Sequence, residues 1–309
     1  MSTYLKDFMF HSDEAERKLL KLEKRSCFDD TYPFGLFPLR RLEKVEFEPV
    51  TIFYGGNGSG KTTILNIIAN KIKALRELPF VPTQFFDWYV NGASGYDPMV
   101  GRIELPGVQY NQSLPEKMRS VPEGTRILCG EDVVDHVLRV RKRNHEINRK
   151  RVALANEWYE ARYVGSAERL FTINGPEGDD WFREMKLRKM SQSQLISREL
   201  GHNVKTGSNG ENAFGYFLEK ITGNSLYLLD EPENSLAGSW QRRLAEYIEA
   251  SARFENAQFI IATHSPFILG IKGAKIYDLD SSTVQVRKWT ELDNVREYFD
   301  FFNAHRSEF

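Results

Sequence analysis

Short apolar runs alternate with amphipathic stretches through the second half of the chain. Residues 226–229 and 259–262 are continuously apolar, which is typical of strands buried on both faces of a parallel sheet. Residues 211–221 and 240–252 carry apolar side chains at helical spacing. Strands separated by helices predict an α/β fold with a mostly parallel, doubly wound sheet. The pattern further predicts a closing hairpin from 274–279 and 283–289, and a last helix at 292–304.

The first two thirds of the chain is less regular. Residues 1–25 have the pattern of an amphipathic helical lead-in, and residues 28–49 are aromatic and proline-rich before a strand-like alternation. Prolines, glycines and aromatics between 79 and 125 indicate loops or a small β section. A short strand at 126–129 precedes a charged helical stretch that runs to about residue 200. We expect a single domain over residues 1–309, with a helical lobe inserted at 132–205.

A glycine-rich loop follows the β-branched and aromatic run 51–54 and leads into an apolar helical stretch. Gly55, Gly60, Lys61 and Thr62 occupy the fixed positions of G-x-x-x-x-G-K-[ST], the P-loop or Walker A pattern. Glycines let backbone N–H groups surround a phosphate, and the following helix N-terminus adds partial positive charge. Lys61 then reaches the β- and γ-phosphates of ATP, and the Thr62 hydroxyl ligates Mg²⁺. The predicted nucleotide-binding residues are Gly55, Gly56, Asn57, Gly58, Ser59, Gly60, Lys61, Thr62 and Thr63.

Two later strand ends carry candidate catalytic groups. The apolar run at 226–229 ends in adjacent carboxylates, where Asp230 is placed to hold Mg²⁺ and Glu231 to polarise an attacking water. The run at 259–262 leads into Thr-His-Ser-Pro, where His264 is placed to contact the γ-phosphate. Earlier in the sequence than both strand ends, Ser208 caps a predicted helix, and Glu211 follows three residues later as in a capping box. A glycine-flanked helix start of this kind is also an anion site.

Four motifs in this order resemble the ATPase domains of ABC-type proteins, and more closely their soluble branch that includes SMC and RecF. The C-terminal half also resembles short bacterial "AAA family ATPase" proteins. The resemblance implies a head-to-tail homodimer that binds two ATP molecules, with Glu231, His264 and Lys61 as catalytic residues. It implies a signature segment acting across the dimer, formed by Ser208, Asn209, Gly210 and Glu211, and a D-loop at Asn234 and Ser235. The signature departs from the usual Leu-Ser-Gly-Gly-Gln, because Asn209 replaces the first glycine and Glu211 the glutamine.

The position of the Q-loop, which supplies a further metal contact in this family, has two candidates. Gly130-Glu131-Asp132 follows a short strand, and strand ends line the nucleotide edge of such sheets, which favours Glu131 or Asp132. Gln84 is the alternative. For the adenine, the family implies an aromatic residue early in the chain. Tyr32 and Phe34 are available there, although packing in the core is an equal alternative for both.

A basic segment stands out in the predicted helical insertion, because the chain as a whole has a net charge of only −1. The segment is a candidate nucleic-acid surface, with a solvated helix face and a partner-protein interface as alternatives. It consists of Arg139, Arg141, Lys142, Arg143, Arg149, Lys150 and Arg151.

The cysteine content and the length of the apolar runs bear on the cell compartment, and the motifs bear on the function. Two isolated cysteines favour a reducing compartment, and no apolar run is long enough to span a bilayer, so we expect a cytoplasmic protein without membrane insertion. The sequence therefore predicts an ATP- and Mg²⁺-dependent ATPase that switches as a dimer, in DNA maintenance or phage defence, with an effector protein as a further candidate partner. The alternatives are the nucleotide-binding subunit of an ABC transporter and a nucleotide-gated binding module with little turnover.

Overall fold

The computed structural model describes residues 3–22, 30–91, 96–97, 101–102, 109–111, 121–164, 183, 186–200 and 209–309. The chain divides into two compact units, Asp135–Ser208 and a larger unit formed by Met1–Val134 together with Asn209–Phe309. Among the described residues, no helix is long and apolar enough to cross a membrane.

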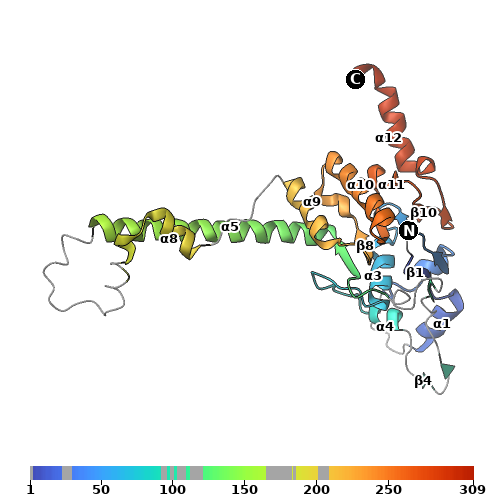
Figure 1. Cartoon of the computed structure of the whole chain (residues 1–309). Helices are drawn as coiled ribbons and strands as arrows, with labels where there is room; N and C mark the ends of the chain where they lie inside the picture. The colour runs from blue at the N-terminus through green and yellow to red at the C-terminus, as the bar shows by residue number, and fades with distance from the viewer. Residues whose placement is uncertain are drawn as a thin grey trace. The chain divides into compact units, whose positions relative to one another are not determined.

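A six-stranded sheet organises the larger unit (Figure 1). Its order is β11 (Gln285–Val286), β10 (Lys275–Asp278), β3 (Val50–Tyr54), β9 (Gln258–Thr263), β8 (Leu226–Asp230) and β7 (Arg126–Cys129). The strands from β10 to β7 run parallel, and β11 closes the edge as an antiparallel hairpin with β10. The predicted fold class, a mostly parallel α/β sheet, is therefore confirmed, and so is the closing hairpin.

Alternating side chains of these strands enter two separate apolar clusters, one on each face of the sheet. Phe53, Leu228 and Ile260 join the cluster that contains α3 (Lys61–Lys71). Ile52 and Ile261 join the cluster on the other face, which contains α9 (Asn209–Lys220), α10 (Gly238–Phe254) and the short α11 (Pro266–Leu269). Since both faces are covered, every residue of β3, β8 and β9 is buried, which explains their continuous hydrophobic runs.

The N-terminal part packs on the α3 face of the sheet. Residues 1–25 were expected to be helical, but β1 (Leu5–Met9) is a strand paired with β2 (Lys44–Glu46) and β6 (Gln109–Tyr110), and only α1 (Asp13–Leu22) is helical. The cause is tertiary, because the buried Gln258 side chain on β9 accepts from the N–H groups of Tyr4 and Leu5 and donates to the Leu5 carbonyl. The other elements of this part are α2 (Leu36–Leu39), α4 (Phe86–Asn91) and the pair β4 (Tyr96–Asp97) and β5 (Gly101–Arg102).

The second unit is built on α5 (Gly130–Tyr159), the long green helix in Figure 1, which begins at the end of β7 and enters this unit at residue 135. Its 30 residues span about 45 Å at the α-helical rise. A short π-helical turn (Glu160–Val164) follows, and α8 (Gln192–Glu199) begins with a capping box at Ser191. A small cluster of Ala161, Leu187 and Leu195 forms the buried core of this unit within the described residues.

The chain closes with α12 (Asp293–Ala304), after the 3₁₀ turn Trp289–Glu291, and ends with a second 3₁₀ turn, Arg306–Glu308. Leu292 and Val295 anchor this end in the cluster around α9 and α10. The last helix therefore begins within one residue of the predicted start at 292.

Gly210, at the start of α9, lies so close to α10 that a side chain does not fit. A Cβ there would lie 2.5 Å from Cδ1 of Trp240. At Gly215, on the same helix, the corresponding Cβ position has no heavy atom of the described residues within 4 Å, apart from nearby backbone of α9 itself. Gly210 and Gly215 therefore provide a crowded and an uncrowded position on one helix for a test of this packing.

We predict that Gly210→Ala lowers the thermal midpoint of unfolding, because the indole must shift in a packed interface, at a cost of about 1–3 kcal/mol. Gly215→Ala should leave the midpoint unchanged or raise it, since alanine favours the helix by up to about 1 kcal/mol. Differential scanning calorimetry on the two variants checks this, and equal midpoints would contradict the close packing.

Candidate functional site

The glycine-rich loop lies between β3 and α3, at the carboxyl end of the central parallel strands. Gly58 and Gly60 have φ values of 77° and 93°, in the region that disfavours other residues. Gly60 also has a close neighbour, because a Cβ there would meet the side chain of Leu36 at 3.0 Å. The backbone conformation at Gly60 therefore favours glycine, and a side chain there would also press on Leu36.

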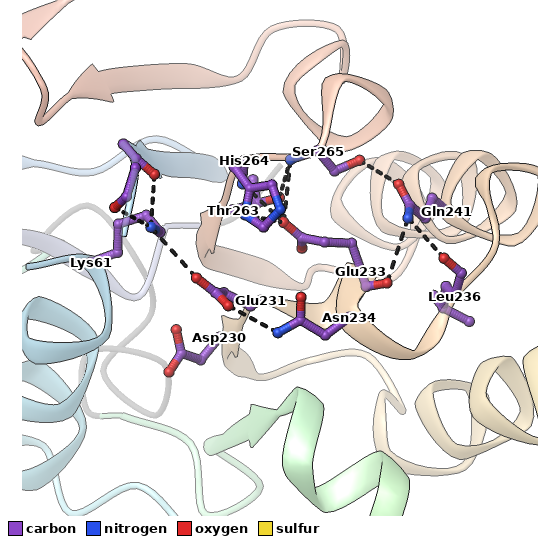
Figure 2. Close-up of polar contacts among 12 residues, drawn as sticks. Lys61, Asp230, Glu231, Glu233, Asn234, Leu236, Gln241, Thr263, His264 and Ser265 are labelled. Atoms are coloured by element: carbon purple, nitrogen blue, oxygen red, sulfur yellow. Dashed lines mark hydrogen bonds and ion pairs between the residues drawn. The ribbon is translucent and has the colours of Figure 1, made fainter. Parts of the chain in front are cut away.

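Lys61 lies almost fully buried inside this loop, with 4% of its surface exposed. Its ammonium donates to the carbonyl oxygens of Gly55 at 2.7 Å and Gly56 at 2.9 Å. Figure 2 shows the same nitrogen facing Glu231, and the distance from Nζ to Glu231 Oε1 is 3.5 Å. The loop lysine and the glutamate at the end of β8 are thus direct neighbours.

Thr62 and Asp230 form the second link between the loop and β8. The Thr62 hydroxyl donates to Asp230 Oδ1 at 3.0 Å. Asp230 is only 8% exposed, and burial raises the pKa of its carboxyl to about 6, against the opposing effect of the Thr62 hydrogen bond. A buried carboxylate beside a hydroxyl is an oxygen donor set that suits Mg²⁺, which proteins commonly hold through one or two side chains and the phosphates of a nucleotide.

Glu231 is held by its backbone and by its side chain. Its φ is 45°, a conformation that costs free energy for a residue other than glycine. Its N–H donates to the Ala262 carbonyl on β9, and its Oε2 accepts from Asn234 Nδ2 at 2.9 Å. The Glu231 side chain therefore projects from the end of β8 toward Lys61, while its backbone is tied to β9.

Glu233 is a site residue that sequence reasoning missed. Its side chain is 4% exposed, and its Oε1 accepts from the Thr263 hydroxyl at 2.5 Å and from the N–H groups of His264 at 2.9 Å and Ser265 at 3.2 Å. Figure 2 shows this carboxylate beneath the turn that carries His264. The His264 ring has Nδ1 3.4 Å from the same oxygen and is 42% exposed. One carboxylate thus fixes the backbone that presents the histidine.

Gln241 on α10 fastens the same turn from the other side. Its Oε1 accepts from the Ser265 hydroxyl at 2.7 Å, and its Nε2 donates to the Leu236 carbonyl at 2.8 Å. Sequence reasoning missed Glu233 and Gln241 because they meet groups on other elements, and the local sequence does not show which distant group a polar side chain will contact.

A cavity of about 390 Å³ opens beside these residues. Thr62, Asp230 and Glu231 line it, together with both favoured Q-loop candidates, Glu131 and Asp132. Asp132 is 3% exposed and its Oδ2 accepts from the Cys129 N–H at 2.7 Å, so it caps the start of α5, whereas Glu131 is exposed. Gln84, the alternative candidate, is exposed and is not one of the residues that line this cavity.

The segment 30–36 packs against the loop from the other side. The Tyr32 hydroxyl is hydrogen-bonded to Thr63 Oγ1, which places this tyrosine next to the start of α3. Phe34 is 7% exposed and packs edge-on against Phe85 and Tyr89. Of the two aromatic candidates for the adenine, Phe34 therefore belongs to the core.

The described signature and D-loop candidates occupy two different places in the chain. Ser208 lies outside the described residues, as does the side chain of Ser235. Asn209, Gly210 and Glu211 open α9, while Asn234 lies in a 3₁₀ turn, Pro232–Ser235, next to Glu231. Of these, Asn234 lines the cavity beside Asp230, and the start of α9 does not.

The basic segment lies on α5 in the second unit. At 100° per residue, five of its seven cations fall within about 120° of the helix circumference, opposite the buried Val137 and Asn144. These five are exposed, and Arg139 is paired with Asp135 at 2.9 Å. The five residues, which we call the basic stripe, are Arg139, Lys142, Arg143, Arg149 and Lys150.

Residues 212–270 match the family described as "AAA domain, putative AbiEii toxin, Type IV TA system". The matched segment contains Asp230, Glu231 and His264, and the sheet brings it against the glycine-rich loop. The chain therefore combines a P-loop sequence pattern between β3 and α3 with a segment that is similar to this AAA family. No curated protein matches the chain in sequence.

Solved structures with low sequence identity cover most of this chain. An Smc head domain from Pyrococcus furiosus, bound to the C-terminal domain of ScpA, is 12% identical over 85% of this chain and 95% of that chain, with a TM-score of 0.37. The SMC head domain from Thermotoga maritima is 15% identical over 79% and 92%, with a TM-score of 0.34. A putative metal-chelate type ABC transporter is 15% identical over 83% and 80%, with a TM-score of 0.37.

Buried Glu16 connects the segment 30–36 to the N-terminal helix. It is 3% exposed, and its Oε2 accepts from the Gly35 N–H at 2.5 Å. Burial raises the pKa of this carboxyl to about 7, although the Gly35 hydrogen bond opposes the rise. The folded protein therefore holds a proton on Glu16 in a pH range where the unfolded chain has lost it, and stability due to this group falls as pH rises from about 4.5 to 7.

We predict that Glu16→Gln gains stability relative to the wild type between pH 5 and pH 8, by an amount on the order of 3 kcal/mol. Urea unfolding at several pH values measures this difference. Glu14→Gln, at an exposed position of the same helix, is the control and should show no comparable trend over this range. Parallel pH profiles for Glu16→Gln and the wild type would contradict the burial of an ionisable carboxyl.

Proposed function

We propose that this chain binds ATP with Mg²⁺ and hydrolyses it at the site formed by the loop after β3 and the end of β8. The observation that carries the proposal is the convergence of two pairs from distant motifs, Lys61 with Glu231 at 3.5 Å and Thr62 with Asp230 at 3.0 Å. A cation, a hydroxyl and two carboxylates at the mouth of a glycine loop are the groups that phosphoryl transfer requires.

Each residue has a distinct role in this proposal. Backbone N–H groups of the loop, other than that of Gly56, surround the phosphates, and Lys61 turns from Glu231 toward the terminal phosphate when the nucleotide enters. Release of that ion pair frees the Glu231 carboxylate to orient a water for attack. Mg²⁺, held by Thr62 and Asp230, would neutralise charge on the phosphates. His264, whose backbone is fixed by Glu233, would contact the γ-phosphate at the exposed edge of the site and so sense whether it is present.

We further propose that two copies form the complete site head to tail. The start of α9 exposes Asn209 and Glu211 and does not line the cavity of its own chain, which supports a role in contacting a nucleotide bound by a second copy. Asn234 is adjacent to Glu231, which would couple the dimer contact to the catalytic carboxylate. ATP then favours the closed dimer and hydrolysis reverses it, as a population shift driven by contacts to the γ-phosphate.

We predict that Glu231→Gln traps a dimer in the presence of ATP and Mg²⁺, because nucleotide binding is retained while water activation is lost. Size exclusion with light scattering should give twice the monomer mass with ATP and the monomer mass without it. Adding Lys61→Ala to this variant is the control and should abolish the shift. A Glu231→Gln protein that binds ATP yet stays monomeric would contradict the sandwich.

For the cellular role, we propose a cytoplasmic ATPase of phage defence or DNA maintenance, with the helical insertion as the part that contacts nucleic acid or an effector protein. Two observations support it. The matched family is described as a putative toxin of a type IV TA system. The basic stripe also presents five cations on one exposed face of α5, over a rise of about 17 Å from Arg139 to Lys150, which suits contact with a phosphate backbone.

We predict that Arg143→Ala, Lys150→Ala and Arg149→Ala together weaken binding to a short DNA duplex and lower the slope of log affinity against log salt by up to about 3. Fluorescence anisotropy over a salt series measures both quantities. The control removes three exposed cations outside α5, Arg253, Lys272 and Arg306, and should leave the slope nearly unchanged. Equal losses in the two triple variants would show that net charge alone, and not the stripe, attracts DNA.

A further inference from the structure

The turn that follows β10 contacts the phosphate-binding loop, although it belongs to none of the nucleotide-binding motifs. The backbone of β10 continues alongside β3, with the Leu279 N–H donating to the Tyr54 carbonyl at 2.9 Å. Immediately afterwards, the Asp280 carboxylate meets the Gly56 N–H, with both Oδ1 and Oδ2 at 2.9 Å from the nitrogen. A residue 224 positions away thus accepts a backbone hydrogen bond from the loop.

The turn itself is well fixed, so Asp280 is presented by a rigid element. Asp278 is 2% exposed, and its Oδ2 accepts from the Ser281 hydroxyl at 2.7 Å and from Arg287 Nη1 at 2.9 Å. Its Oδ1 accepts from the Asp280 N–H at 3.0 Å. Burial opposes ionisation of Asp278, but these hydrogen bonds prevail and hold its pKa below the ordinary value. Asp280 thus projects from a turn locked by a charged network.

The hydrogen bond to Asp280 and a hydrogen bond to Lys61 are made by the two ends of one peptide group. The peptide between Gly55 and Gly56 donates its N–H to Asp280 and accepts through its carbonyl from Lys61 Nζ at 2.7 Å. The group is planar and trans, so its N–H and carbonyl point in opposite directions. Fixing the N–H on Asp280 therefore also fixes the oxygen that holds the ammonium of Lys61. Glycine on both sides would otherwise leave this plane free to rotate.

We propose that Asp280 is a positioning residue for ATP binding, which orients the Gly55–Gly56 peptide and through it holds Lys61 at the phosphate site. This inference rests on the proposed function and adds to it a residue outside the known motifs. Asp280 is itself exposed and carries a negative charge close to a site for polyphosphate. A carboxylate there opposes an anionic ligand by simple repulsion, so its benefit to binding must come from orienting the loop.

Two measurements test the proposal, and the first needs no nucleotide. In hydrogen–deuterium exchange of the free protein, Asp280→Ala should speed exchange in the peptide that contains residues 55–61. In calorimetric titration with ATP and Mg²⁺, Asp280→Ala should weaken binding by about tenfold, the loss expected for a charge-assisted hydrogen bond. Asp280→Asn keeps one oxygen acceptor without the charge and should restore most of the protection and the affinity.

The control is Asp300→Ala, which removes the same charge from an exposed position on α12 and should change neither measurement. Unchanged exchange in Asp280→Ala would overturn the proposal, and so would tighter ATP binding by this variant, because repulsion would then be the main effect of the carboxylate. If the wild type does not bind ATP, the proposed function fails, while the exchange experiment still decides whether Asp280 orders the loop.

Discussion

The hydrogen bond from Thr62 to Asp230 is the contact on which the site depends, because it joins two motifs 168 residues apart. It exists because β3, β9 and β8 are adjacent, parallel and in register, so that Tyr54 pairs with Thr263 and Asp230 pairs with Ala262. The three strands consequently end at one edge of the sheet, where chains of this architecture bind ligands. A shift of one residue in this register would turn Asp230 to the opposite face.

Buried charge at this edge of the sheet carries a cost in the folded chain. Asp230 is buried with a raised pKa and Glu231 has a left-handed backbone conformation, and both features cost free energy. The Lys61 ammonium is enclosed by two carbonyls and a carboxylate, and these contacts offset the loss of its hydration. The cost therefore falls on the two acidic residues and not on the lysine.

Carboxylates that hold backbone groups recur around the pocket. Glu233 holds the turn that carries His264, Asp280 holds the phosphate-binding loop, and Asp132 caps α5 at the cavity wall. Each accepts from an N–H group that lacks a partner within its own strand or helix. Because loops at strand ends cannot satisfy these groups by regular pairing, side chains from neighbouring elements do so and set the loop geometry.

The sequence alone determined the features that come from local chemistry. The glycine loop, the paired acids after an apolar strand and the covered parallel sheet are all contained in short stretches of residues 51–63 and 226–263, because phosphate contact and two-sided burial each impose a local pattern. Tertiary structure alone decided that residues 5–9 form a strand, that Phe34 packs in the core, and that Glu233 and Asp280 hold loops of the site. These outcomes depend on partners more than 30 residues away, and a side chain carries no local sign of which distant backbone group it will meet.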